Sequence, residues 1–297
     1  MKSKLMKKIS LFTLLTAGAT CFGVGYTYSD TVAESPKAEI SITDVLSKPI
    51  SQWQLPSELR EVSAIALLDN NLIACVQDEE GAIYFYDLEQ KSVKDKVTFA
   101  GPGDYEGIAI NGSTAYIIRS DGTIFEIADF RDSKPAVTTH KSVLAATQNT
   151  EGLAFDSKNN RLLIACKGYD TALGDNKGIY AFSLETRKMS EKPVITIPLN
   201  QEELQASAKK KKDKYAVLQP SSLDVHPVTG ELYMLDAVNN RIMVVSEQGE
   251  IRKMAELDGE LLRQAEGLSF GSNGEMYIAS EGGKKGSGVI VKYATSL

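Results

Sequence analysis

Cysteine and histidine are scarce in this sequence, with three cysteines and two histidines among 297 residues. Cys21 lies in an apolar N-terminal segment, and Cys75 and Cys166 lie in apolar runs of two different, non-adjacent repeats. A disulfide between Cys75 and Cys166 is therefore not expected, and both are predicted to be small buried residues.

Motifs for several kinds of catalysis are also missing. The sequence has no P-loop, no Cys-x-x-Cys pair, no His-Glu-x-x-His and no dinucleotide fingerprint. Neither histidine accompanies a Gly-x-Ser-x-Gly serine. His226 precedes Pro227 in a turn, where a polar residue at the surface is usual. Nucleophilic catalysis therefore has little support.

Positive charge is limited outside the N-terminus. The formal net charge is -6 although four lysines fall within the first eight residues, so the rest of the chain is more acidic still. Nucleic-acid binding needs a basic footprint. The composition therefore predicts no nucleic-acid partner, and it leaves room for a cationic ligand.

Residues 1–28 have the pattern of an export signal or membrane anchor. After the four lysines, residues 9–28 carry no charge and are long enough to cross a bilayer. An uncleaved segment or a lipid on Cys21 would anchor the chain, whereas cleavage after a small residue near Ala19 would release it. We favour an anchor, which makes the membrane a partner and places the body outside the cytoplasm, periplasmic or at the surface. Residues 29–48 are predicted to be a linker.

One stretch recurs along the rest of the chain, most clearly as Glu151-Gly152-Leu153-Ala154-Phe155. Copies begin at Glu106 and Glu266, a looser copy begins at Glu61, and a fourth slot has Ser221 in place of glutamate. Successive starts are 45 residues apart except for one interval of 70. A fixed period in this range predicts a repeat architecture.

Each repeat contains about four short runs of β-branched and aromatic residues, separated by hairpin-turn sequences such as Asn-Gly and Asp-Gly. Four strands in about 45 residues is the spacing of a propeller blade. We predict an all-β protein, with residues 49–297 forming a single five-bladed β-propeller and residues 50–55 adding the fourth strand of the last blade. Six blades are the alternative. The insert at residues 201–217 is expected to be helical or loop-like.

The repeated glutamates are the main candidates for chemistry. Innermost strands line a propeller's channel, so the glutamates that precede them should converge on its axis. Two carboxylates about 5 Å apart repel by roughly 3 kcal/mol at an effective dielectric near 20. Oxygen ligands favour Ca²⁺ as the compensating ion. The alternatives are hydrogen bonds to backbone amides and direct catalysis. The predicted metal ligands are Glu61, Glu106, Glu151 and Glu266.

The ends of the second strands should lie near one mouth of the channel. Their mixed charges are typical of a ligand rim, although exposed strand ends are polar in any case. Asp104, Tyr105 and Asp224 are further candidates for the same area. The predicted rim residues are Gln77, Arg119, Lys167, Asp236 and Glu281.

Several stretches resemble the SdiA-regulated (YjiK-like) β-propeller family across about residues 50–297. The most specific is Gln264-Ala265-Glu266-Gly267-Leu268 with the following Tyr277-Ile278-Ala279-Ser280-Glu281. This resemblance implies a bacterial propeller tethered to the cell envelope. Residues 223–233 are more distantly similar to NHL and gluconolactonase-type propellers, whose lactonases hold an axial divalent metal. The blade starts also resemble those of esterase-like phytases, which implies Ca²⁺-assisted phosphoester chemistry.

Two functional hypotheses follow. The first is an envelope-anchored module whose channel binds a cation and whose mouth recognises a small molecule or a protein. The second is a Ca²⁺-dependent hydrolase of the phosphoesterase or lactonase kind, in which the glutamates hold the metal. Since fold does not determine function, the arrangement of side chains at the channel mouth has to distinguish the two hypotheses.

Overall fold

The computed structural model describes residues 41–206, 214–284 and 286–295. Contacts divide the chain into two units, Met1–Ala38 and Glu39–Leu297. The predicted signal or anchor at residues 1–28 lies outside the described residues. Among the described residues, no helix is sufficiently long and apolar to span a membrane.

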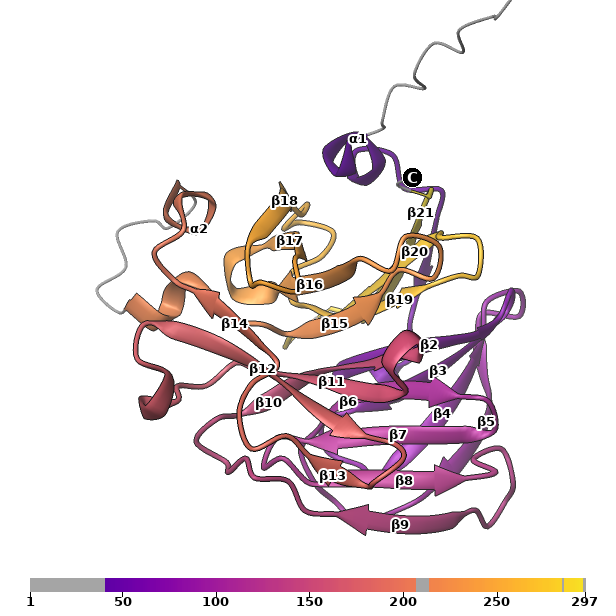
Figure 1. The fold of residues 1–297 in the computed structure, drawn as a ribbon. Coiled ribbons are helices and arrows are strands. Elements are labelled where there is room, and N and C mark those ends of the chain that lie inside the picture. The colour runs from indigo at the N-terminus through magenta and orange to yellow at the C-terminus, as the bar shows by residue number, and fades with distance from the viewer. Residues whose placement is uncertain (1–40, 207–213, 285, 296–297) are drawn as a thin grey trace, which may run out of the picture. The chain divides into compact units, whose positions relative to one another are not determined.

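The second unit is an all-β, five-bladed propeller, as predicted (Figure 1). Blade 1 contains β2 (Val62–Asp69), β3 (Leu72–Gln77), β4 (Ala82–Asp87) and β5 (Ser92–Thr98). Blade 2 contains β6 (Tyr105–Asn111), β7 (Thr114–Arg119), β8 (Ile124–Ala128) and β9 (Ala136–His140). Neighbouring strands in each blade are antiparallel.

The other three blades repeat this arrangement. Blade 3 contains β10 (Thr150–Asp156), β11 (Arg161–Cys166) and β12 (Asn176–Ser183), with β13 (Lys188–Met189) and β14 (Ile195–Pro198) both paired to β12 as its outer edge. Blade 4 contains β15 (Ser222–Val225), β16 (Leu232–Asp236), β17 (Arg241–Val245) and β18 (Ile251–Glu256). Blade 5 contains β19 (Ala265–Phe270), β20 (Met276–Ser280) and β21 (Val289–Tyr293).

The fourth strand of blade 5 is β1 (Ser51–Gln54), which pairs antiparallel with β21. This confirms the predicted closure by residues 50–55. Trp53 of β1 donates from Nε1 to the Leu88 carbonyl oxygen of blade 1 at 2.8 Å and stacks on Tyr277 of blade 5. The ring is complete because β2 contacts β6, β6 contacts β10, β10 contacts β15, β15 contacts β19 and β19 contacts β2.

A core cluster fills each of the five junctions between neighbouring blades. Side chains along each strand alternate between the two faces of the blade, and each face packs into the cluster at one of the two neighbouring junctions. This explains why the strands read as almost continuous apolar runs. Cys75 and Cys166 are buried and free, in two different junctions, as predicted.

Part of the predicted linker is structured. Residues Ile42–Leu46 form helix α1, whose Ser41 side chain accepts from the Asp44 amide as an N-cap. Ile42 and Val45 are buried in the core cluster between blades 4 and 5. Their three-residue spacing places both on one face of a single helical turn, a signal too short to stand out in the sequence. The predicted insert includes helix α2 (Glu202–Ala206) and a 3-10 turn at Lys214–Val217.

Three of the five repeats have a glycine directly after the glutamate, and this glycine allows close packing between blades. A Cβ on Gly152 would lie 2.8 Å from Leu223 Cγ of the next blade and 3.1 Å from the Leu223 amide nitrogen. We expect Gly152→Ala to lower the free energy of unfolding by about 1–3 kcal/mol, because such overpacking forces the blades apart. Urea unfolding followed by circular dichroism would measure the loss.

Gly101→Ala is the matched control for Gly152→Ala. A Cβ on Gly101 would meet no atom within 4 Å. The control should therefore change stability by less than about 0.5 kcal/mol. Equal stability of the two variants would contradict the close-packing role of Gly152.

Candidate site at the axial carboxylates

The innermost strands all start at the same end of the channel, and three of them carry a glutamate at a β-bulge. Pairing with the second strand shifts between Tyr105 and Gly107, between Thr150 and Gly152, and between Ala265 and Gly267. The residues that the shifts leave without a partner on the second strand are Glu106, Glu151 and Glu266. Bulges redirect side chains, and here they place the three glutamates at equivalent positions in blades 2, 3 and 5.

In blade 1 the equivalent residue is Ser63 and not Glu61. The register shift of this blade falls between Val62 and Ala64. Ser63 is buried and its hydroxyl donates to the Tyr105 carbonyl oxygen at 2.5 Å. Ser221 in blade 4 donates in the same way to the Ala265 carbonyl oxygen at 2.8 Å. The predicted fivefold set is therefore three glutamates and two serines, and each serine fixes the backbone just before the next blade's glutamate.

Glu61 lies at the edge of this set. It pairs with the neighbouring Arg60 at 3.1 Å, and its side chain is 36% exposed, against 4% for Glu151. Its negative charge still reaches Asp78 and contributes to raising the pKa of that carboxyl. Glu61 is thus an outer member of the acidic cluster.

Lys167 brings a positive charge to the glutamates. It follows β11, and its Nζ lies 3.0 Å from Glu151 Oε1. The same oxygen accepts from Asn149 Nδ2 at 2.7 Å. Burial alone would lower the pKa of Lys167, but Glu151, Glu266 and Glu106 outweigh it and raise the pKa. Lys167 is therefore the built-in counter-ion of the three axial glutamates.

One ammonium does not neutralise the whole cluster. Burial raises the pKa of Glu106, and the charges of Glu151 and Asp104 raise it further. Burial likewise raises the pKa of Glu266, helped by a hydrogen bond with Glu281. Glu151 also has a raised pKa because burial outweighs the stabilising effect of Lys167. The site therefore retains protons at neutral pH, shared between neighbouring carboxyl groups.

Asp78 faces the same cluster from the end of blade 1's second strand. Burial raises its pKa to about 6, with contributions from the charges of Glu281 and Glu61. Its Oδ1 atom is buried and has no hydrogen-bond partner. A buried carboxylate oxygen without a partner carries a desolvation cost that a bound cation or donor would relieve.

Four of the five predicted rim residues divide into two groups. Lys167 and Glu281 join the axial cluster, where Glu281 also accepts from Gln264 Nε2 at 2.9 Å. Arg119 turns to Asp121 at 2.7 Å, and the Gln77 side chain accepts from the Glu79 amide at 2.5 Å. These contacts leave Arg119 and Gln77 around the cluster and not within it.

Asp236 is fully buried. It accepts from Arg241 and from Asn239, and Arg241 is also buried. Burial raises the pKa of Asp236 although Arg241 lowers it. These contacts make Asp236 part of an internal ion pair beneath the predicted rim.

Two supporting residues had no signal in the sequence that set them apart. Asn149 holds Glu151, as described above. Lys177 is buried at the start of β12, and its Nζ donates to the carbonyl oxygens of Lys167 and Gly168, the latter at 2.7 Å. Lys177 therefore fixes the backbone that presents Lys167. A single lysine at a strand end normally indicates solvent exposure.

The predicted position of His226 at the surface is wrong. His226 is fully buried, and its ring packs against Phe270 and Tyr233. Its Nδ1 accepts from the Thr229 amide at 3.1 Å, which caps the turn that follows. The turn is at the surface, but the imidazole provides an apolar face that fills the junction between blades 4 and 5.

The residues present do not form a ready Ca²⁺ site. Among the described residues, no three His, Cys, Asp or Glu side chains are grouped to hold a metal ion. The Lys167 ammonium beside Glu151 would repel a divalent cation unless it moved away. The Ca²⁺ site at Glu61, Glu106, Glu151 and Glu266 stays a prediction.

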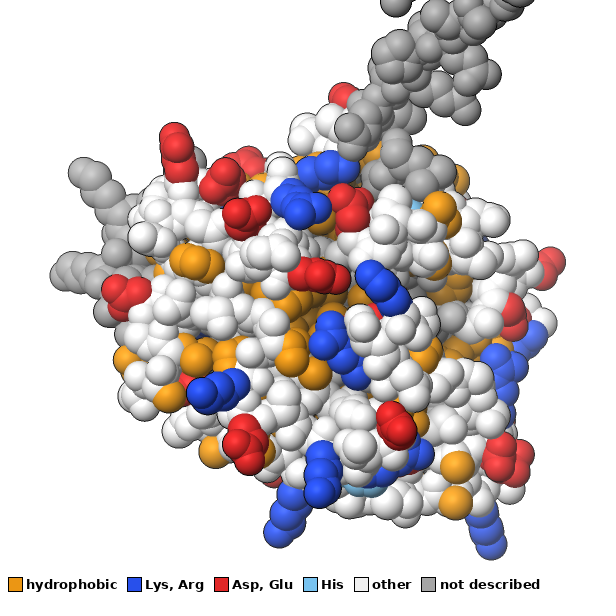
Figure 2. Space-filling model, viewed as in Figure 1, with side chains coloured by type: hydrophobic (Ala, Val, Ile, Leu, Met, Phe, Trp, Pro, Cys, Tyr) orange, Lys and Arg blue, Asp and Glu red, His pale blue; other side chains and the backbone are white. Residues whose placement is uncertain are grey.

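On the face shown in Figure 2, acidic and basic side chains are interspersed.

Comparison with known proteins agrees with this architecture. The SdiA-regulated family model matches residues 59–283. The search of curated proteins finds no match. Among solved structures, the chain is similar to glutaminyl cyclase from Myxococcus xanthus, at 9% identity and a TM-score of 0.54, over 83% of this chain and 95% of that one. A luciferin-regenerating enzyme gives 13% identity and a TM-score of 0.51, with the same coverages.

At these identities the structural similarity shows the fold alone. The family model, by contrast, matches strands of all five blades, from before β2 to beyond β20, and omits only β1 and β21 among the described strands. It also covers the three axial glutamates and Lys167, so the resemblance seen in the sequence is confirmed. The chain belongs to the SdiA-regulated family of β-propeller proteins.

Proposed function

We propose that this protein is an envelope-tethered recognition module whose axial mouth binds a cation or the cationic group of a ligand. The observation that carries the proposal is the convergence of Glu106, Glu151 and Glu266 around a single ammonium, that of Lys167. The excess of carboxyl groups, together with the unpaired Asp78 Oδ1, favours an added positive charge.

The raised pKa values predict how such binding would proceed. A cation stabilises the ionised form of nearby carboxyl groups, so its arrival should release the protons that Glu106 and Glu266 hold. Binding would then tighten as pH rises. An ammonium or guanidinium ligand could take a place like that of Lys167, whereas Ca²⁺ would require Lys167 to move.

The test is calorimetric titration of the full chain with Ca²⁺ and, separately, with 1,5-diaminopentane at pH 7.5. We expect saturable binding of at least one cation, accompanied by proton release that is measured as a difference in heat between buffers of different ionisation enthalpy. The Glu151→Gln/Glu266→Gln double variant should weaken binding by at least roughly tenfold, the effect of losing one charge-assisted hydrogen bond.

Asp121→Asn is the control for a general loss of negative charge. Asp121 pairs with Arg119 outside the axial cluster, and its side chain is 41% exposed. Binding should be unchanged in this variant. Failure of both cations to bind the folded parent, or an equal loss in Asp121→Asn, would overturn the proposal. Binding by Ca²⁺ alone would instead support the predicted metal site.

Ca²⁺-dependent hydrolysis is the second candidate function. A Ca²⁺-dependent phosphoesterase or lactonase needs an open metal position beside a general base. In the present arrangement Glu151 is paired with Lys167, and Glu266 shares a hydrogen bond with Glu281. If Ca²⁺ binds, turnover of a phosphomonoester or a lactone that disappears in the double variant would establish this second function.

A further inference from the structure

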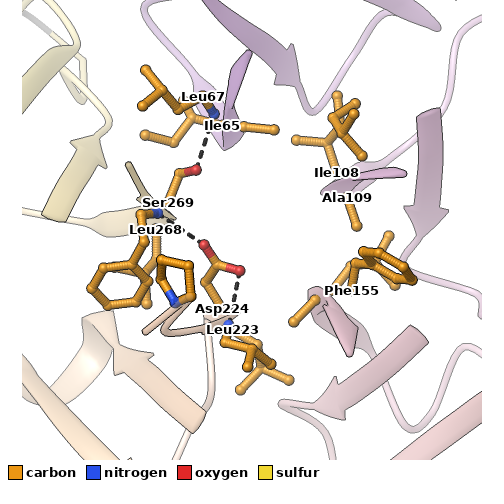
Figure 3. Close-up of a pocket in the computed structure, with 16 residues that line it drawn as sticks. Ile65, Leu67, Ile108, Ala109, Phe155, Leu223, Asp224, Leu268 and Ser269 are labelled. Carbon is orange, nitrogen blue, oxygen red and sulfur yellow. Dashed lines mark hydrogen bonds between the residues drawn. The ribbon is translucent and has the colours of Figure 1, made fainter. Parts of the chain in front are cut away.

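A second candidate site lies further along the channel, beyond the axial glutamates. A cavity of about 170 Å³ is lined by the later residues of the five innermost strands, β2, β6, β10, β15 and β19 (Figure 3). Glu106 is the second residue of β6, whereas Ile108, Ala109 and Ile110 line the cavity. The cavity is therefore separate from the carboxylate mouth and two to four residues deeper along each strand.

Most of the side chains that line the cavity are apolar. Every blade contributes a branched aliphatic side chain two residues after the bulge position, or its equivalent in blade 4. Phe155 and Phe270 add aromatic rings from blades 3 and 5. The aliphatic residues are Ile65, Ile108, Leu153, Leu223 and Leu268.

The polar side chains of the cavity lining come from blades 4 and 5. At the next position along the strands, blades 1, 2 and 3 have Ala66, Ala109 and Ala154, but blade 4 has Asp224 and blade 5 has Ser269. In Figure 3 the side chains of Asp224 and Ser269 lie on one side and Ile108, Ala109 and Phe155 on the other. The sequence placed Asp224 near the glutamates, but its position on β15 puts it in this deeper cavity.

Asp224 is held rigidly and keeps acceptor capacity. Its Oδ2 accepts from the Phe270 amide at 2.9 Å and its Oδ1 from the Val225 amide at 2.8 Å. Ser269 Oγ accepts from the Leu67 amide at 3.0 Å in the next blade. A carboxylate has about four lone-pair sites, so each oxygen can accept a further donor.

Burial raises the pKa of Asp224 to about 7, although the two amide bonds lower it. Asp224 is partly buried beside apolar side chains, and no cationic side chain of the described residues contributes to its pKa. Unpaired charge in such an environment is costly, and a bound cation would offset that cost.

From this geometry we infer a second ligand site that takes a small amphiphilic cation, with its ammonium on Asp224 and its hydrocarbon body against Ile108, Ile110 and Phe155. The size matches, because a cavity of ~150 Å³ is sufficient for benzene. The proposal does not depend on cation binding at the glutamates, since the two sites share no side chain.

Cyclohexylammonium is a suitable probe, and cyclohexanol is its neutral counterpart of nearly the same shape. We would titrate both into the full chain at pH 8 and follow binding by calorimetry. Cyclohexylammonium should bind saturably, and Asp224→Asn should weaken it by roughly tenfold or more, because a charge-assisted hydrogen bond is lost. Cyclohexanol binding should change far less in the same variant.

Glu266→Gln separates the two sites. It removes a carboxyl group of the mouth whose side chain does not line the cavity, so cyclohexylammonium bound in the cavity should keep its affinity within about twofold of the parent. Circular dichroism would establish that both variants are folded. Absence of saturable binding to the parent, or an equal loss in Asp224→Asn and Glu266→Gln, would overturn the inference. In the second case the probe occupies the carboxylate mouth.

Discussion

Arg241→Ala should lower the free energy of unfolding by about 3–5 kcal/mol, because it leaves a buried carboxylate without its counter-ion. The Arg241 side chain is 1% exposed and that of Asp236 is 0% exposed. Arg241 Nε and Nη2 lie 3.1 and 3.0 Å from Asp236 Oδ2, and Nη2 also donates to the Val217 carbonyl oxygen. Urea unfolding monitored by Trp53 fluorescence and circular dichroism would measure the loss.

The chain contains its own matched control for this variant. The pattern Asp-x-x-Asn-Asn-Arg occurs at residues 156–161 as well as 236–241. Both copies form a 3-10 turn capped by the aspartate and end at an asparagine with positive φ. Arg161 is 26% exposed, so water screens its 2.8 Å contact with Asp156. Arg161→Ala should therefore cost about 1 kcal/mol or less.

Replacing both partners of the buried pair tests the mechanism. Asp236→Leu/Arg241→Met removes both charges, so it should be less destabilising than Arg241→Ala despite altering more atoms. Equal stability of Arg241→Ala and the parent would contradict the buried ion pair. It would then support Asp236 as an accessible group at the ligand rim.

The parent protein should lose stability between about pH 5 and pH 9. Burial raises the pKa of Glu106 to about 9 and that of Glu266 to about 10, whereas an unfolded glutamate titrates near about 4.3. In this window the folded protein holds protons that the unfolded chain has released. The free energy of unfolding therefore falls as pH rises, by at most about 1.4 kcal/mol per pH unit for each group.

Glu106→Gln/Glu266→Gln should flatten this dependence. Neutral amides occupy the same space without titrating, so the double variant should be more stable than the parent by a few kcal/mol, on the order of 2–4, at pH 8. Urea unfolding at pH 5, 7 and 9 provides the comparison. A parent whose stability does not change over this range would mean that both carboxyl groups are ionised when folded.

Asp121→Asn checks that the slope belongs to the axial carboxyl groups. Arg119 lowers the pKa of Asp121 to about 2, with smaller contributions from Thr123. The stability that this depressed pKa provides is present above the unfolded value and is lost only as pH falls toward 2. Asp121→Asn should therefore shift the whole curve between pH 5 and 9 and leave its slope unchanged.

The fold was largely predictable because each blade repeats the same local signals. Hairpin-turn sequences and apolar runs predict the successive strands, and the two-residue loop between β6 and β7 begins with Gly112 at a φ of 60°, a conformation that favours glycine. The closing strand was predictable from an incomplete last repeat. Helix α1 was missed because a single apolar pair, Ile42 and Val45, is too short a pattern to predict a helix. The pair is buried only because it packs on the junction between blades 4 and 5.

The site was predictable in outline only. Aligning the repeats on glutamate placed Glu61 two residues away from the true equivalent, Ser63. The aliphatic residue that follows would have corrected the alignment, since Ile65 matches Ile108 and Leu153 along their strands. A bulge adds one residue to one strand, which a comparison by simple spacing cannot show.

Charge partners were harder to predict because they come from different strands. Lys167 was expected at the rim, but its pairing with Glu151 depends on how β10 and β11 meet. No feature of the sequence indicates that Arg241 is buried, and its contact with Asp236 makes that aspartate a structural group. Both outcomes depend on packing, which hydrophobic patterning does not encode.

Closure by β1 has a consequence for the order of events during synthesis. Trp53 and its neighbours emerge from the ribosome early, whereas β21 emerges only after every other blade strand. Blades 1 to 4 can form as local units as the chain lengthens, but the ring cannot be sealed until nearly the whole sequence is available. Until then β1 and the growing edge are unpaired strands that other chains could join. A chain that crosses a membrane before it folds would keep β1 and β21 unpaired during passage. The ring would then close once both strands have crossed.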